Sequence, residues 1–269
     1  MARKNYDWEG GAELEEHTKK KHFILREYFR QYLITRCQLP QQEKFRLAIV
    51  DGFTGAGLYK CGSFGSPMIF VDVLIKTANE INFHRSNQSM RPIQLECLLI
   101  LNDQDESAIN QLRKNIAPLL VAASENNETI HIEPEFLNNS FEGIYPHVKK
   151  RLHAAKCRNV LFNLDQCGYS HVPSTIIRDI INSWRSAEVL LTFMIGSLLA
   201  YLSPQKEVTG VPLEATVKDK IDNLLKNGDQ LLGKTQWSGE AEKIVYSHYK
   251  NCATYVSPFS INNPKGWRY

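Results

Sequence analysis

Short apolar runs alternate with amphipathic helical patterns along most of the chain, and this alternation constrains the fold more than any other feature. Five runs have the length and composition of buried strands: Leu47–Val50, Leu95–Leu101, Ile130–Ile132, Asn159–Leu164 and Glu188–Ile195. Apolar runs of this kind are typical of parallel strands that are covered on both faces. We therefore expect an α/β fold, with an open, mostly parallel sheet and helices on both of its faces.

The segments between these runs carry apolar residues at helical spacing. Helices are expected over residues 13–36, 68–78, 105–116, 141–152, 177–184 and 217–225. Ser66 is the expected N-cap of the second helix, with Pro67 at its first position. Loops are expected over 79–93 and 122–129, and Tyr255–Ile261 is a candidate last strand. Since no repeat or low-complexity linker interrupts the pattern, we expect a helical arm at 1–46 and one domain at 47–269.

Composition excludes several classes of protein. Hydrophobic residues make up 43% of the 269 residues and charged residues 23%, as in soluble globular proteins. The longest apolar candidate, Val189–Leu202, is interrupted by polar residues and is shorter than the roughly 18 residues that a membrane helix needs. No signal-peptide core follows Met1. Six cysteines without C-x-x-C spacing indicate reduced thiols and no metal site, so we expect a cytoplasmic protein that binds no membrane.

Charge is distributed unevenly along the chain. The net charge of +3 divides into +3 over residues 1–46, −6 over 47–148 and +6 over 149–269. Basic flanks suit a polyanion such as RNA or DNA, but solvated helix faces would give the same counts. The Lys19–His22 cluster on the first helix likewise allows a binding role or a solvent-exposed one. Lys21 and His22 either reach a cofactor carboxylate or a phosphate, or they face the solvent.

A glycine-rich turn follows the first expected strand, at the sheet edge where α/β proteins bind ligands. It reads Asp51-Gly-Phe-Thr-Gly55-Ala-Gly57, and its glycines allow a tight turn and close approach of a ligand. Asp51 can bind an ammonium group or a backbone N–H there. The turn is no P-loop, which needs Gly-Lys-Ser/Thr. It is also a poor dinucleotide fingerprint, because Lys60 stands where a third glycine or alanine is expected.

The second expected strand, Leu95–Leu101, is followed by Asn102 and Asp103. The chain thus has a hydrophobic strand, then D-x-F-x-G-x-G, then a second strand that ends in an acid. This series resembles the class I S-adenosylmethionine (SAM)-dependent methyltransferases, which have a Rossmann-like fold. The resemblance implies that the turn packs on the methionine part of SAM, through Gly52, Phe53, Gly55 and Gly57. It also implies that Asp103 accepts hydrogen bonds from both ribose hydroxyls, as a carboxylate with two oxygens can do. Asn102 and Asp105 are the alternatives, and Asp105 also fits a helix N-cap.

The same resemblance gives roles to residues after the third and fourth strands. Asn138-Asn139-Ser140 stands where class I enzymes place a polar residue near the adenine, although Asn139 and Ser140 equally fit a helix cap. The fourth strand ends in Asn163-Leu-Asp165-Gln-Cys-Gly-Tyr169. In amino-methylating members an Asp/Asn-Pro-Pro-aromatic motif stands here, so Asp165 would bind the acceptor amine and Tyr169 would stack on a base. Gln166 stands in place of the proline. The alternative interpretation is that the segment is an ordinary turn at the end of the strand.

A series of motifs narrows the resemblance to the three-Cys-motif partner family. The series is His17-Thr-Lys-Lys-Lys21-His22-Phe-Ile-Leu25 with Tyr28, then Asp51–Tyr59, then Gly62-Ser-Phe-Gly65-Ser-Pro67. The resemblance implies a methyltransferase that accompanies a three-Cys-motif, radical-SAM-like protein. It departs at Gln166-Cys167, where the family has Pro-Phe. It also departs after Gly266–Tyr269, where the family continues, so the chain is either truncated or a naturally short member.

Two functions of different classes follow from these motifs. The first is a SAM-dependent methyltransferase whose acceptor is a nucleic acid, given the basic flanks and Tyr169. The second is a non-catalytic protein that keeps the SAM fold and binds nucleic acid or another protein, which the departure at Gln166 favours. A nicotinamide oxidoreductase is less consistent with the sequence, because of Lys60 and the absence of an acid at the expected spacing.

Overall fold

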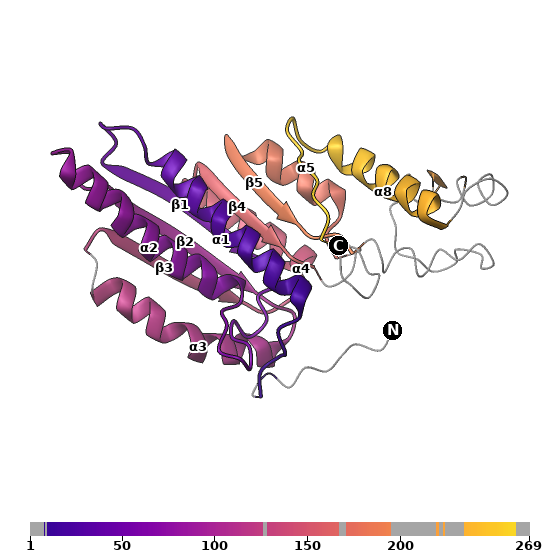
Figure 1. Cartoon of the computed structure of the whole chain (residues 1–269), viewed down its shortest axis with the longest axis horizontal. Coiled ribbons are helices and arrows are strands. Elements are labelled where there is room, and N and C mark those ends of the chain that lie inside the picture. Colours follow the sequence, from indigo (N-terminus) through magenta and orange to yellow (C-terminus); the bar gives the residue numbers. More distant parts are fainter. Residues whose placement is uncertain are drawn as a thin grey trace. The chain divides into compact units, whose positions relative to one another are not determined.

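The computed structural model describes residues 8, 10–125, 128–166, 171–194, 219–220, 223 and 234–261 (Figure 1). The chain divides into two compact units. The first consists of Met1–Leu164 with Trp184–Leu190, and the second of Asp165–Ser183 with Leu191–Tyr269.

The first unit alternates strands and helices in the expected order. Its elements are α1 (Glu16–Arg36), β1 (Lys44–Asp51), α2 (Ser66–Asn87), β2 (Gln94–Asn102), α3 (Glu106–Glu125), β3 (Ile130–Leu137), α4 (Phe141–Ala154), β4 (Asn159–Leu164) and β5 (Ser186–Leu191). The last residue of β5 falls in the second unit. The helices of the second unit include α5 (Ser174–Ser183) and α8 (Lys234–Lys250).

The strands form one parallel sheet in the order β3-β2-β1-β4-β5. Strand β1 pairs with β2 from Lys44↔Gln94 to Asp51↔Leu101, and with β4 from Ala48↔Val160 to Asp51↔Asn163. The prediction of a Rossmann-like α/β fold is thus confirmed. The chain extends the sheet first to one side of β1 and then to the other, so the strand order reverses between β1 and β4. Such a switch point is where open α/β sheets form a crevice for ligands.

Both faces of the sheet are covered, as the unbroken apolar runs predicted. Alternate residues of the central strands, such as Leu47, Ile49 and Leu99, join one core cluster with helices α1, α2 and α3. On the other face, the rings of Phe141 and Tyr145 from α4 each lie 6.5 Å from the Phe162 ring of β4. Figure 1 shows α1 and α2 in front of the sheet and α4 behind it. The covered sheet leaves its carboxyl edge as the place for a ligand.

Helix α2 differs from its prediction at both ends. Gly65, not Ser66, is the N-cap, because its N–H donates to the carbonyl of Gly57 at 2.7 Å and ties it to the glycine turn. The helix continues to Asn87, so the loop expected over 79–93 is wrong for its first half. The reason is Arg85, which is 4% exposed and donates to four carbonyl oxygens, including those of Leu39 and Arg91.

Other boundaries are corrected as well. Helix α3 extends to Glu125, into the loop expected from residue 122, and β5 begins two residues before the expected Glu188. Helix α8 was not predicted. The described residues Tyr255–Ile261 form no strand, and Tyr255 and Phe259 are exposed there. The helix expected over 217–225 lies mostly outside the described residues. Within the residues that the structure describes, no helix has the length and apolar character that crossing a membrane requires.

A half-buried glutamate on β5 predicts a measurable pH dependence of stability. Glu188 accepts a hydrogen bond from the Tyr28 hydroxyl of α1, and burial raises the pKa of the Glu188 carboxyl. Protonation of Glu188 therefore stabilises the folded chain at low pH. This stabilisation is lost as the pH rises from the ordinary glutamate pKa, about 4.3, through the raised pKa of Glu188. Glu188→Gln, which stays neutral, should become more stable relative to wild type between pH 4.5 and 7.5 in urea unfolding. Glu13→Gln, at an exposed position, is the control. A pH-independent Glu188→Gln difference would contradict the expectation.

Candidate functional site

The glycine-rich turn lies across the ends of three neighbouring strands. It leaves β1 at Asp51 and is held on both sides by backbone hydrogen bonds. The N–H of Gly52 donates to the Asn163 carbonyl of β4, and that of Thr54 to the Asn102 carbonyl of β2, both at 3.0 Å. Gly55 has φ +55° and Gly57 has φ +74°, values that favour glycine over residues with a Cβ. The turn therefore sits at the switch point with its backbone fixed.

Asp103 is held directly against this turn. Its carboxylate accepts the N–H of Gly55 at 2.8 Å and the N–H of Asp105 at 2.9 Å. The Asp103 residue remains partly exposed. Its side chain thus joins the turn after β1 to the beginning of α3, while part of its surface faces solvent. Among the three polar residues proposed after the second strand, it is the one whose carboxylate contacts the glycine turn.

Asn102 and Asp105 have other positions. Asn102 is 1% exposed, and its amide donates to the carbonyls of Gly52 and Asn139 at 3.1 and 3.0 Å. Asp105 accepts the N–H of Ser107 at 2.9 Å, as an N-cap does. Burial would raise the pKa of Asp105, but hydrogen bonds from the Trp8 indole and from Ser107 lower it overall. Asn102 therefore ties strand ends together, and Asp105 caps α3.

The polar segment after β3 forms the cap of α4. The Ser140 hydroxyl accepts the N–H of Gly143 at 3.2 Å, and the Asn139 side-chain oxygen accepts the N–H of Ser140 at 2.7 Å. Asn138 donates to the Asp103 carbonyl at 2.9 Å. These bonds place Asn139 and Ser140 beside the strand ends of the site. The capping interpretation is confirmed for Ser140, and the adenine contact stays a prediction.

Asp51 and Phe53 contact residues of β4 and α4, respectively. Asp51 is fully buried, and its Oδ1 accepts the side-chain N–H of Asn163 at 3.1 Å. The Phe53 ring lies 6.0 Å from that of Phe141, the first residue of α4. Asp51 thus links β1 to β4 through a side-chain hydrogen bond, and its burial keeps it from solvent in this structure.

The proposed acceptor-binding residues follow β4 in the chain and belong to the second unit. Gln166 is 1% exposed, and its side-chain oxygen accepts the N–H of His171 at 2.9 Å. Tyr169 lies outside the described residues, so the structure gives no geometry for it. The roles of Asp165, Gln166 and Tyr169 therefore stay predictions.

Two contacts to the glycine turn were not expected. A Cβ added to Gly55 would lie 3.3 Å from two ring atoms of Trp8, so this ring covers one side of the turn. The Asn115 amide on α3 donates to the Ala56 carbonyl at 2.8 Å. Neither residue belongs to a recognisable motif, and the only sequence signal for either is a tryptophan upstream of the first helix.

Gly57 offers a test of how tightly the turn is packed. A Cβ there would lie 2.5 Å from Cδ1 of the buried Leu112 on α3 and would also have to adopt the positive φ. Gly57→Ala should lower the free energy of unfolding by about 2–4 kcal/mol in chemical denaturation. Gly62→Ala is the matched control, because φ is +77° there but nothing lies within 4 Å of its added Cβ. Equal losses in the two variants would show that the Leu112 contact is unimportant.

Comparison with known proteins does not assign the chain to a family. A scan against models of protein families found none that matches the chain, and a search of curated proteins found no match either. The resemblance to the three-Cys-motif partner family therefore stays an interpretation of the motifs.

Proposed function

We propose that this chain is a SAM-dependent methyltransferase. The observation that carries the proposal is the 2.8 Å hydrogen bond from the Gly55 N–H to the Asp103 carboxylate. It joins a glycine turn after β1 to an acid after β2 at the edge where the strand order reverses. That edge is where Rossmann-like sheets bind ligands, and the pairing of turn and acid is the one that the resemblance to class I enzymes implies.

The chemistry of these residues fits the cofactor. At its glycines, the turn would present backbone atoms to the methionine part of SAM, beside the Trp8 ring that covers one side of Gly55. The Asp103 carboxylate is fixed by two N–H groups and partly exposed, and a carboxylate has about four acceptor sites in all. It can therefore hold a ribose diol. Asn139 and Ser140 would contact the adenine. Bound SAM would supply an activated methyl group, and the protein's task is to align the acceptor with it.

Direct binding measurements test the proposal. Isothermal titration calorimetry of the full chain with SAM and with S-adenosylhomocysteine should give saturable heat, with affinity in the micromolar range. Absence of heat with both would contradict the proposal. NAD⁺ titrated under the same conditions is the control for a general nucleoside site, and we expect it to give no heat.

We propose a nucleic acid as the methyl acceptor. The basic flanks of the chain and an aromatic residue, Tyr169, after the fourth strand support this choice. Asp165 would then bind the target amine. Transfer of a labelled methyl group from SAM to RNA or DNA should be detectable and should weaken steeply as salt rises. Transfer with a flat salt dependence would favour a protein or small-molecule acceptor.

One observation favours a second function, a SAM-fold protein that binds without catalysis. Gln166 stands where the family has proline, and its side-chain oxygen is engaged by the His171 N–H in a fully buried position. A side chain held in this way is part of the local fold rather than a ligand for an acceptor. SAM binding without methyl transfer to total RNA, DNA or protein would support this function, and labelled product would exclude it.

A further inference from the structure

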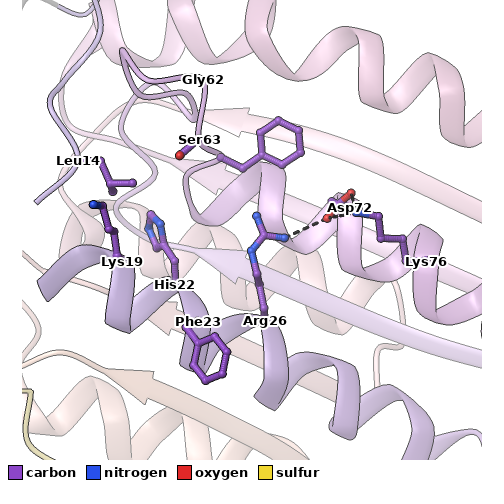
Figure 2. Close-up of a pocket in the computed structure, with 10 residues that line it drawn as sticks. Leu14, Lys19, His22, Phe23, Arg26, Gly62, Ser63, Asp72 and Lys76 are labelled. Carbon is purple, nitrogen blue, oxygen red and sulfur yellow. Dashed lines mark hydrogen bonds and ion pairs between the residues drawn. The ribbon is translucent and has the colours of Figure 1, made fainter. Parts of the chain in front are cut away.

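A cavity on the first unit lies between α1, α2 and the segment that follows the glycine turn (Figure 2). Its volume is about 460 Å³, within the range of sites that hold small molecules. Helix α1 contributes Lys19, His22, Phe23 and Arg26, and α2 contributes Asp72 and Lys76.

Positive charge predominates in the cavity. Lys19, Arg26 and Lys76 line it together with one carboxylate, Asp72, and Lys19 also pairs with Glu16, one turn earlier on α1, at 2.5 Å. Arg26 and Lys76 share that carboxylate, at 3.0 and 2.8 Å, and Figure 2 shows both cations directed toward it. The Lys76 side chain is 73% exposed while that of Asp72 is 13% exposed. The excess positive charge on the solvent side therefore favours an anionic ligand.

An exposed aromatic ring accompanies these cations. Phe23 is 71% exposed, and in Figure 2 its ring points away from the Ser63 segment. An aromatic face beside a cationic groove is the arrangement that binds single-stranded nucleic acid, with the base stacked and the phosphate paired. An inorganic anion or an acidic peptide would use the cations but would gain little from this ring.

The cavity is connected to the glycine turn through a short hairpin, Leu58–Phe64. Leu58 and Phe64 form an antiparallel bridge, and the Tyr59 N–H donates to the Ser63 carbonyl at 3.0 Å. The Tyr59 ring lies 5.6 Å from the ring of His22 on α1. The hairpin begins directly after Gly57 and ends directly before Gly65, so one wall of the cavity continues the turn that the proposed function assigns to SAM.

We propose that this cavity binds a single-stranded segment of nucleic acid, with successive phosphates along Lys19, Arg26 and Lys76 and a base stacked on Phe23. The inference rests on the proposed methyl transfer to nucleic acid and gives the acceptor a docking site on α1 and α2. Within the Lys19–His22 cluster, it assigns Lys19 to phosphate recognition rather than to a solvated helix face.

Fluorescence anisotropy with labelled 15-nucleotide oligouridylate and oligothymidylate tests the site on the full chain. Phe23→Ala should weaken binding roughly 5- to 100-fold, the usual effect of losing one stacked base. Lys76→Gln should reduce the slope of log affinity against log salt by about 0.7, as expected for one lost phosphate contact with a single strand. Both positions are exposed, so neither change should unfold the chain.

Matched controls lie elsewhere on the same unit. Phe83→Ala removes an aromatic residue of α2 that is 65% exposed and does not line the cavity. Lys150→Gln removes an exposed lysine of α4, on the other face of the sheet. Both should bind the oligonucleotides as wild type does. Three outcomes would each overturn the inference. They are wild-type affinity in Phe23→Ala and Lys76→Gln, no binding of either oligonucleotide at low salt, and full competition by polyglutamate.

SAM calorimetry on the same samples separates this inference from the proposed function. Phe23→Ala should bind SAM as wild type does, because the ring lies outside the glycine turn. Oligonucleotide binding that depends on Phe23 without any SAM heat would contradict the methyltransferase and uphold the docking site. If SAM gives saturable heat but oligonucleotide binding is unchanged in Phe23→Ala and Lys76→Gln, the methyltransferase proposal is supported and the docking site is contradicted.

Discussion

Asp103→Ala should weaken SAM binding roughly 100-fold or more in calorimetry of the otherwise intact protein. The proposed diol contact consists of two hydrogen bonds to a charged group, each contributing about 1.5–3 kcal/mol, and 1.4 kcal/mol corresponds to a tenfold change in affinity. The same substitution removes the acceptor of the Gly55 and Asp105 N–H groups, so the turn also loses its fixed position. Both losses act in the same direction.

Two further variants separate these causes. Asp103→Asn keeps one side-chain oxygen for a backbone N–H but loses the negative charge, so its SAM affinity should fall between those of wild type and Asp103→Ala. Glu106→Gln removes an exposed carboxylate three residues further along, in the first turn of α3, and should bind SAM as wild type does. Wild-type affinity in Asp103→Ala would exclude this carboxylate as the ribose ligand.

The sheet could be predicted because its strands are buried on both faces. A strand such as β4 is apolar almost throughout, with Val160, Leu161 and Phe162 all fully buried, so its signal is local and does not depend on knowing its neighbours. The parallel order then follows from the alternation with helices. The Tyr255–Ile261 segment has a similar composition but no strand, and its exposed Tyr255 shows that apolar content alone does not provide a pairing partner.

Helix ends were harder to predict, because tertiary contacts determine them. The second half of α2 contains polar residues, and its buried face there includes Arg85, whose guanidinium satisfies carbonyls up to 46 residues away in the sequence. No local pattern marks an arginine as a buried residue. The N-cap at Gly65 likewise depends on the carbonyl of Gly57, whereas the cap at Ser140 is formed within its own helix and was predictable from its residue type.

The residues of the candidate site likewise include some that the sequence could predict and some that it could not. Asp103 and the glycine turn could be predicted, because both follow directly from where strands end. Trp8 could not, because its indole donates to Asp105, 97 residues further along the chain. Asn102 was considered as a ribose ligand, yet its burial gives it a structural role. A polar residue at a strand end thus has two uses, and only its exposure distinguishes them.

Asn102→Ala should lower the free energy of unfolding by about 2–5 kcal/mol in chemical denaturation followed by circular dichroism. The Asn102 amide donates to the carbonyls of Gly52 and Asn139, and its oxygen accepts the N–H of Asn139. Removing this side chain leaves three backbone groups in or near the core without a partner. Each buried unsatisfied group costs about 1–3 kcal/mol, and partial hydration of the half-buried ones reduces the total.

Asn102→Asp sharpens the test, because the shape is kept while the donor is lost. An ionised carboxylate would lie against the Gly52 and Asn139 carbonyl oxygens, so the loss at pH 7 should exceed that of Asn102→Ala and should diminish in acid, where a protonated carboxyl donates again. Asn138→Ala is the control, since Asn138 is exposed and donates one hydrogen bond to the Asp103 carbonyl. Equal losses at 102 and 138 would contradict the view that Asn102 ties together the strand ends under the glycine turn. In that case, the position of Asp103 would not depend on Asn102.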